Sequence, residues 1–244
     1  VDIARILTAS DPRFITGVEF NSEDDRGKYH ILGYGYDPGS DVIEGMIQKV
    51  RNMRMMKVTE RVDGLKSRFG IEFPSDEVEA LMALYNPGKP HIANLMVKYG
   101  YVSDKTQAIK DYIDKIPIPN SHIDPKSAIE GIIKAGGIPV LAHPPYGSGD
   151  EMILGDELDE RVRKMISYGL RGVEGFYSQY TNLMCRQVLE IAEKYDLYVS
   201  AGSDYHGKNK LVILGDTGLE NVRERPRGLI RFIELAQSLL TEVG

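Results

Sequence analysis

From residue 125 onward, two hydrophobic patterns alternate along the chain at regular intervals. Apolar residues at three and four spacing predict helices, and short β-branched runs that follow glycine predict strands. The predicted order is helix 125–135, strand 138–142, helix 156–168, strand 170–176, helix 179–195, strand 197–201 and a closing helix 226–241. Repeated helix-to-strand units of this length indicate an α/β fold with a parallel sheet or barrel.

The start of the chain has a different hydrophobic pattern. A short helix-compatible stretch, 2–9, precedes an alternating run at 13–21 and a second apolar run at 29–34. A polar turn separates the two runs. This pattern predicts two strands joined as a hairpin.

Only helical periodicity is present between residues 41 and 121. Helices are predicted at Asp41–Phe69, 75–85, 91–99 and 104–113, with glycine and proline between them. We therefore expect an α/β core formed by residues 1–40 and 122–244, interrupted by an all-helical insertion at residues 41–121.

Polar residues that could bind a metal follow three of the predicted strands. His143 follows strand 138–142, Glu174 lies near the end of its strand, and Asp204 and His206 follow strand 197–201. In an α/β barrel the functional groups gather at the carboxyl ends of the strands, so we expect these side chains to share a cavity. On extended backbone, Asp204 and His206 would point to the same side.

Two further candidates lie in the predicted hairpin: Glu19 near the end of its first strand and His30 near the start of its second. Each candidate also has a simpler interpretation when taken singly. Glu19 could be a solvated carboxylate, His30 a core histidine, and the Asp-x-His stretch a turn. It is their joint placement at strand ends that favours a metal site.

A different kind of candidate lies in the helical insertion, where Lys89-Pro90-His91 stands at a predicted helix start. Proline presets the helical backbone there, and the free N–H groups of a first turn favour an anion. A phosphate could bind at this turn. The alternative, an exposed N-terminal turn with no ligand, has equal weight.

Composition narrows the function classes. The chain has 244 residues, 42% of them hydrophobic, and a net charge of −6, which argues against a broad basic face that holds long duplex nucleic acid. Its single cysteine, Cys185, allows no disulfide framework. No apolar run approaches the roughly 18 residues of a membrane span. We expect a cytoplasmic protein that does not act at a membrane.

These candidates form part of five short motifs, which occur in the order and rough spacing of the PHP (polymerase and histidinol phosphatase) superfamily. They are Gly17-Val18-Glu19, His30 within YHILGY, Lys89-Pro90-His91-Ile92-Ala93, Ala142-His143-Pro144 and Gly202-Ser203-Asp204-Tyr205-His206. Essentially the whole chain resembles this superfamily, and in particular its TrpH-like metal-dependent phosphoesterases.

The resemblance implies a distorted (β/α)7 barrel that holds two or three divalent metal ions, with the helical insertion over its mouth. Glu19 would bridge two metals, and His30 and His143 would complete the second metal's ligands. Asp204 would bind the first metal and His206 a third. Mixed imidazole and carboxylate ligands suit Mn, Fe or Zn. No catalytic residue is implied beyond these ligands.

This sequence departs from the family pattern in one respect. The family begins with a His-x-His strand and a later Asp-His pair, which supply further ligands to the first and third metals. No histidine precedes His30 here. Either these family residues lie upstream of Val1 in the gene, which we favour because the other ligands are present together, or the chain is a degenerate relative.

The function implied by the resemblance is hydrolysis of phosphate esters through a metal-activated water. Small nucleotides, nucleoside bisphosphates and short RNA ends are the implied substrates, with His91 and Lys89 holding a phosphate. Two alternatives stay open: a non-catalytic metal-binding or regulatory module on the same barrel, and an exonuclease-like role.

Overall fold

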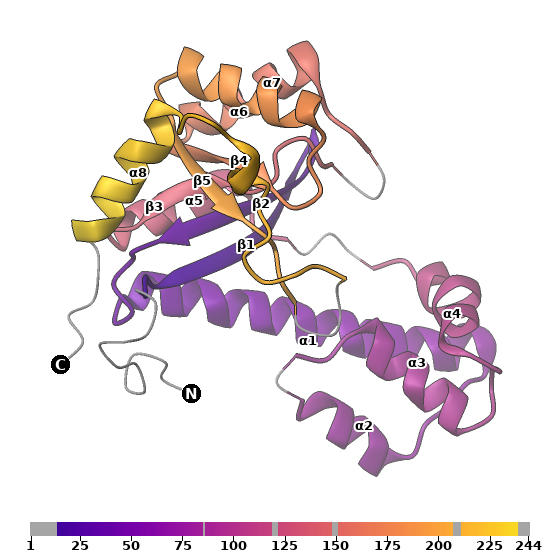
Figure 1. Ribbon diagram of the computed structural model, residues 1–244. Coiled ribbons are helices and arrows are strands. Elements are labelled where there is room, and N and C mark those ends of the chain that lie inside the picture. Colours follow the sequence, from indigo (N-terminus) through magenta and orange to yellow (C-terminus); the bar gives the residue numbers. More distant parts are fainter. Residues whose placement is uncertain (1–13, 85, 119–121, 148–150, 207–210, 239–244) are drawn as a thin grey trace. The chain divides into compact units, whose positions relative to one another are not determined.

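The computed structural model describes residues 14–84, 86–118, 122–147, 151–206 and 211–238 (Figure 1). The chain divides into two compact units, one made of Val1–Glu44 with Ile123–Gly244 and the other of Gly45–His122. The helix predicted at residues 2–9 lies outside the described residues. Each unit is described by itself.

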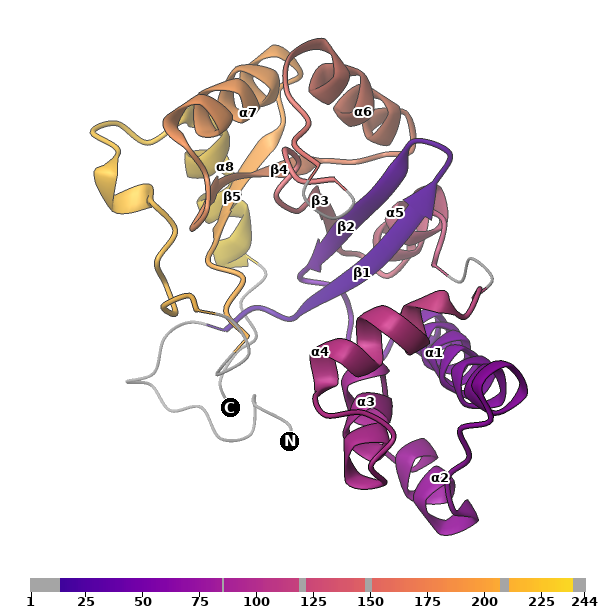
Figure 2. The ribbon, with the colours of Figure 1, turned by 90° about the vertical axis from the view of Figure 1, so that its right-hand side faces the viewer.

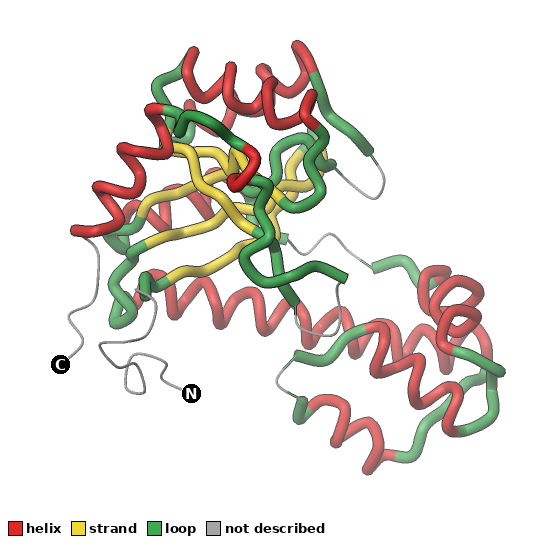
Figure 3. The backbone as a smooth tube through the Cα atoms, viewed as in Figure 1, coloured by secondary structure: helices red, strands yellow, loops and turns green. Residues whose placement is uncertain are grey.

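The first unit is built on a five-stranded sheet (Figure 3). In chain order and in sheet order its strands are β1 (Gly17–Asp24), β2 (Gly27–Tyr34), β3 (Ile138–Leu141), β4 (Gly172–Tyr177) and β5 (Tyr198–Gly202). Strand β2 is antiparallel to both of its neighbours, whereas β3, β4 and β5 are parallel. The structure confirms an α/β fold and the predicted hairpin.

The tight turn of the hairpin explains its register. Gly27 has a φ of 121°, which a residue with a Cβ rarely adopts, and the Asp24 carboxylate accepts the N–H of Arg26 at 2.8 Å. This turn pairs Asp24 with Gly27 and carries the pairing back to Gly17 and Tyr34. This register determines, for each residue of β1, on which of the two faces of the sheet its side chain lies.

Four helices accompany this sheet: α5 (Pro125–Lys134), α6 (Gly155–Ser167), α7 (Asn182–Lys194) and α8 (Arg227–Ser238). Helix α5 packs against β1, β2 and β3, and lies behind the hairpin in Figure 2. Helix α7 packs against β4 and β5, and α8 against β5. These helices and strands β3, β4 and β5 follow the predicted order closely, and among the described residues their ends are displaced by no more than three residues.

The two faces of the sheet are filled differently. Leu32 and Val140 are register partners and therefore share a face, where the ring of Phe232 from α8 packs against Val140. On the opposite face Gly33 meets Ile132 of α5 so closely that a Cβ on this glycine would lie 2.9 Å from it. A larger residue at position 33 would push α5 away.

In the second unit, the described residues form helices and the turns that join them. They are α1 (Asp41–Phe69), which begins in the first unit, α2 (Ser75–Met82), α3 (Lys89–Lys98), α4 (Lys105–Gln107), a π-helical turn (Ala108–Tyr112) and a 3₁₀ turn (Ile113–Lys115). Buried side chains from α1, α2, α3, the π-helical turn and the 3₁₀ turn form its core, among them the fully buried Leu65, Ile92 and Ile113. The helix predicted at 104–113 is a continuous helical segment whose hydrogen bonding changes from α to π and then to 3₁₀. No described helix combines the length and apolarity that crossing a bilayer requires.

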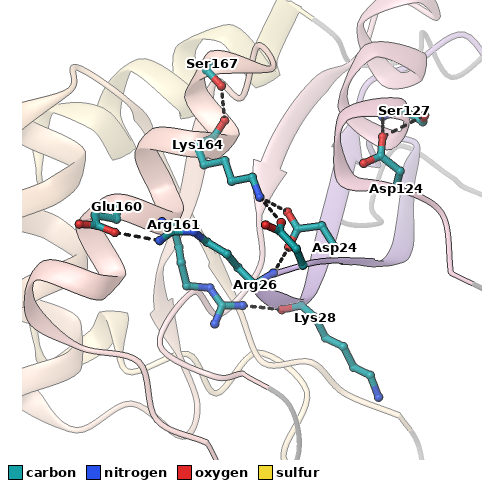
Figure 4. Close-up of polar contacts among 10 residues, drawn as sticks. Asp24, Arg26, Lys28, Asp124, Ser127, Glu160, Arg161, Lys164 and Ser167 are labelled. Atoms are coloured by element: carbon teal, nitrogen blue, oxygen red, sulfur yellow. Dashed lines mark hydrogen bonds and ion pairs between the residues drawn. The ribbon is translucent and has the colours of Figure 1, made fainter. Parts of the chain in front are cut away.

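A buried arginine connects α6 to the hairpin (Figure 4). Arg161 is 3% exposed, donates a hydrogen bond from Nη2 to the carbonyl of Lys28 at 3.1 Å, and lies over the ring of Tyr29 at 4.6 Å. Ion pairs of Lys164 with Asp24 and of Arg26 with Glu160 surround it closer to the surface. Since Lys28 and Tyr29 immediately precede His30, α6 holds the part of β2 that carries this histidine.

We expect Arg161→Ala to lower the free energy of unfolding by about 2–4 kcal/mol, because it leaves the Lys28 carbonyl unpaired and removes the packing on Tyr29. Chemical denaturation followed by circular dichroism would measure the change. Arg163→Ala is the matched control, since this exposed residue lies on the same helix and its loss should cost less than about 0.5 kcal/mol. Equal effects of the two substitutions would contradict the anchoring role of Arg161.

Candidate metal centre

Three predicted ligands converge at one end of the sheet. The Nδ1 atom of His30 lies 2.8 Å from Oε1 of Glu19 and 3.2 Å from Nε2 of His143. One ligand atom from each of the three residues lies within 4.8 Å of the other two. Two imidazoles and a carboxylate thus share a single point.

Strand register brings Glu19 and His30 together. Glu19 pairs with Leu32 and His30 pairs with Asn21, so Glu19 and His30 are diagonal neighbours on the same face of an antiparallel pair. Such diagonal neighbours are within reach of long side chains. The hairpin turn therefore determines this half of the cluster.

His143 reaches the cluster by a departure from strand geometry. The N–H of Ala142 donates to the carbonyl of His30 at 2.9 Å, which continues the β2–β3 pairing one residue beyond β3. Alternation along extended backbone would then send His143 to the opposite face. Instead its φ is 29°, in the left-handed region, and its ring contacts the ring of His30 edge-on at 4.9 Å.

The electrostatics of the cluster keep a nitrogen lone pair available. Burial, reinforced by the neighbouring His30, lowers the pKa of His143 to about 4, although Glu19 and Asp204 oppose the shift. The hydrogen bond with His30 lowers the pKa of Glu19. Near neutral pH, His143 is therefore an uncharged imidazole and Glu19 a carboxylate, which are the states that bind metals.

The arrangement fits a transition-metal ion. Donors bound at 2.0–2.1 Å in a tetrahedral shell lie about 3.3 Å apart, and the two imidazole nitrogens are 3.2 Å apart. Nitrogen and carboxylate oxygen together suit Zn, Mn or Fe. Glu19, His30 and His143 can hold one such ion and leave positions for other ligands.

Asp204 and His206 form a pair just after β5. Nδ1 of His206 lies 3.1 Å from Oδ1 of Asp204, and Oδ2 of Asp204 accepts a hydrogen bond from the hydroxyl of Tyr177 at 3.2 Å. The expectation of extended backbone here is wrong, because the φ of Asp204 is 51°. Among the described residues, the cluster within 4.8 Å contains neither of the two, although the charge of Asp204 affects the pKa of both Glu19 and His143.

Lys89 and His91 lie in the second unit, at the start of α3 (Lys89–Lys98), where the cap residue Gly88 has no side chain to bond the first turn. Lys89 forms an ion pair with Asp114. The Nδ1 atom of His91 is buried and has no hydrogen-bond partner within the described part of the chain. The predicted helix start is confirmed.

Sequence reasoning missed how β4 supports the cluster. It identified Glu174 as a strand-end residue that could bind a metal, whereas among the described residues the cluster does not contain it and its Oε2 accepts the N–H of His143 at 2.9 Å. It did not select Tyr177 at all. An aromatic residue in an apolar strand gives no sequence signal that its hydroxyl faces a carboxylate.

Comparison with known proteins gives three related sequences. Over 199 residues, 29% are identical to a 5'-3' exoribonuclease of Haemophilus influenzae, covering 79% of this chain and 69% of that protein. A phosphoribosyl 1,2-cyclic phosphate 1,2-diphosphodiesterase of Eggerthella lenta is 27% identical, over 80% of this chain and 73% of that protein. A 3',5'-nucleoside bisphosphate phosphatase of Chromobacterium violaceum is 26% identical, over 79% of this chain and 67% of that protein. No family model matches the chain.

Two solved structures resemble this one. A protein of Bifidobacterium adolescentis, described as a candidate metal-dependent phosphoesterase, has a TM-score of 0.68 and 28% identity, over 91% of this chain and 76% of that one. An amidohydrolase of Chromobacterium violaceum, with bound sulfate and no metal, has a TM-score of 0.67 and 23% identity, over 95% and 78%. The second likeness concerns the fold alone.

We expect His143→Ala and Glu19→Ala to weaken Zn²⁺ or Mn²⁺ binding by more than about 100-fold. Loss of a residue that only orients a metal ligand weakens binding by up to about 100-fold, and loss of a ligand itself should cost more. Isothermal titration calorimetry on the full chain would measure the affinities. Glu190→Ala serves as a control, since this glutamate is exposed on α7. Unchanged affinity in both ligand variants would show that the cluster binds no metal.

Proposed function

We propose, from the premise that this chain is a relative of the metal-dependent phosphoesterases of the PHP superfamily, that it hydrolyses phosphate esters of small nucleotides or short RNA ends. The observation that carries the proposal is the convergence of Glu19 and His143 on Nδ1 of His30, which forms a cluster suited to a divalent metal. The three curated relatives support it, because each is named for an activity on phosphoesters of nucleotides, RNA or a phosphoribosyl compound.

The proposed roles follow the resemblance. Glu19, His30 and His143 hold a metal, and Asp204 and His206 contribute to the remaining sites of a centre with two or three Mn, Fe or Zn ions. A bound divalent metal supplies Lewis-acid stabilisation of phosphoryl oxygens and activation of water. The uncharged state of His143 near neutral pH keeps its Nε2 available as a ligand.

Three finer features also belong to this proposal. The five-stranded sheet forms part of a distorted (β/α)7 barrel, and residues 41–121 form an inserted subdomain that acts as a lid. The net charge of −6 favours small phosphorylated substrates over long duplexes. The single cysteine agrees with a cytoplasmic location.

With Mn²⁺ present, we expect the chain to release phosphate from a 3',5'-nucleoside bisphosphate, and we expect chelation to abolish the release. In His143→Ala, kcat/KM should fall by on the order of 100-fold or more, because a metal ligand is lost. A phosphate-release assay measures both, with Glu190→Ala as control. Metal binding without turnover of this substrate or of a 5'-phosphorylated short RNA would instead favour the non-catalytic metal-binding module.

The exonuclease-like alternative is favoured by the Haemophilus influenzae relative. A labelled RNA of several nucleotides distinguishes it from the phosphatase. Stepwise release of mononucleotides from the 5' end would support the exonuclease, whereas loss of phosphate alone would support the phosphatase.

We propose that His91 and Lys89 bind a substrate phosphate. If they do, His91→Ala and Lys89→Ala should raise KM about tenfold, since each would remove one charge-assisted hydrogen bond of about 1.5 kcal/mol. Metal affinity should not change. Lys105→Ala is the control, because this lysine is exposed in the same unit. A KM equal to that of the control would show that both residues serve the helical unit alone.

A further inference from the structure

Strand β4 supplies none of the proposed metal ligands, yet it contacts a ligand on each side. Toward β3, Oε2 of Glu174 accepts the N–H of His143 at 2.9 Å. Toward β5, the hydroxyl of Tyr177 donates to Oδ2 of Asp204 at 3.2 Å. Glu174 and Tyr177 are both buried, with exposed fractions of 4% and 5%.

A β-bulge places these two residues on one face. Glu174 and Tyr177 are three positions apart, which on a regular strand would put them on opposite faces. The register shifts between Glu174 and Phe176, so that Glu174 pairs with Ser200 and Tyr177 with Gly202, two positions apart on β5. The extra residue, Gly175, therefore directs both side chains to the face that carries the cluster.

The bulge itself requires a glycine. A Cβ at position 175 would lie 2.6 Å from Cγ1 of Val199 and 2.9 Å from a methyl group of Leu189. Close packing of β4 between β5 and α7 thus leaves room for the extra backbone unit only without a side chain.

The two ligands held in this way share an uncommon backbone conformation. His143 and Asp204 both have positive φ, at 29° and 51°, which non-glycine residues adopt at a cost in free energy. Such a conformation persists only where the surroundings impose it. Glu174 accepts a hydrogen bond from the backbone N–H of His143, whereas Tyr177 donates one to the carboxylate of Asp204.

Glu174 is also confined from the side of β5. A Cβ on Gly202 would lie 2.1 Å from Oε1 of Glu174, so the carboxyl group fills the space that any other residue at 202 would need. One oxygen thus lies against β5, while the other accepts the N–H of His143, two residues beyond the end of β3. The carboxyl group spans three neighbouring strand ends.

We propose that Glu174 and Tyr177 are positioning residues that hold the ligands His143 and Asp204 in metal-binding geometry from strand β4. This inference rests on the proposed function for its purpose, but its geometry is independent of the substrate. Among the described residues, the metal-binding cluster contains neither Glu174 nor Tyr177. Their effect is exerted through the two ligands.

The test measures affinity for Zn²⁺ and Mn²⁺ by calorimetry on the full chain, together with the free energy of unfolding without metal. Glu174→Ala and Tyr177→Phe should each weaken metal binding by about 10- to 100-fold, the usual effect of losing a residue that orients a ligand. Glu174→Gln should stay within about threefold of the parent, because its amide oxygen can still accept the N–H of His143.

Two further variants keep the test decisive. Tyr195→Phe removes a matched hydroxyl, which donates to Asp159 at 2.9 Å away from the cluster, and should leave metal affinity unchanged. Gly202→Ala displaces the Glu174 carboxyl group without altering that residue, and should weaken binding as Glu174→Ala does. If Glu174→Ala does not fold, Gly202→Ala and Tyr177→Phe carry the test.

The outcomes separate this inference from the proposed function. Weakened metal binding in these variants supports the positioning role even if no phosphate ester is hydrolysed, in which case only the proposed function fails. Affinities within about threefold of the parent in folded Glu174→Ala, Gly202→Ala and Tyr177→Phe would overturn the positioning role, whatever the enzymatic activity.

Discussion

The pairing of β2 on both of its edges is the constraint on which the candidate centre depends. Its antiparallel register with β1 puts Glu19 diagonal to His30, and its register with β3 ends one residue before His143. A slip of one residue on either side would move a ligand to the opposite face of the sheet. The hairpin turn at Gly27 and the buried guanidinium of Arg161 both stabilise this register.

Much of the α/β unit follows from the sequence because its signals are local. Glycine after the preceding helix identifies β3 and β4, a short run of aromatic and β-branched residues identifies β5, and the polar turn identifies the hairpin. The long helix Asp41–Phe69 is predicted to the residue, since its apolar spacing ends at Gly70. The change from α to π geometry after Gln107 has no comparable signal.

The candidate ligands could be named from the sequence, but their geometry could not. The sequence predicts Glu19 near the end of its strand, whereas it is the third residue of β1. Alternation along a strand would put His143 on the wrong face, and it would give Asp204 an extended backbone that it does not have. In both cases the positive φ has no signal in the strand periodicity, and the contacts that accompany it come from β4, which is distant in the sequence. The bulge at Gly175 is equally non-local, as it reflects close packing against Val199.

The close approach of Glu174 to Gly202 has a consequence for how this protein can diverge. Two positions 28 residues apart in the sequence share one volume, so a side chain at position 202 conflicts with the observed place of the Glu174 carboxyl group. A homologue with alanine or serine at the position of Gly202 would need a shorter side chain at that of Glu174, a carboxyl group turned out of this space, or a displaced strand end. In an alignment of relatives, the residues at the positions of Glu174 and Gly202 should therefore vary together.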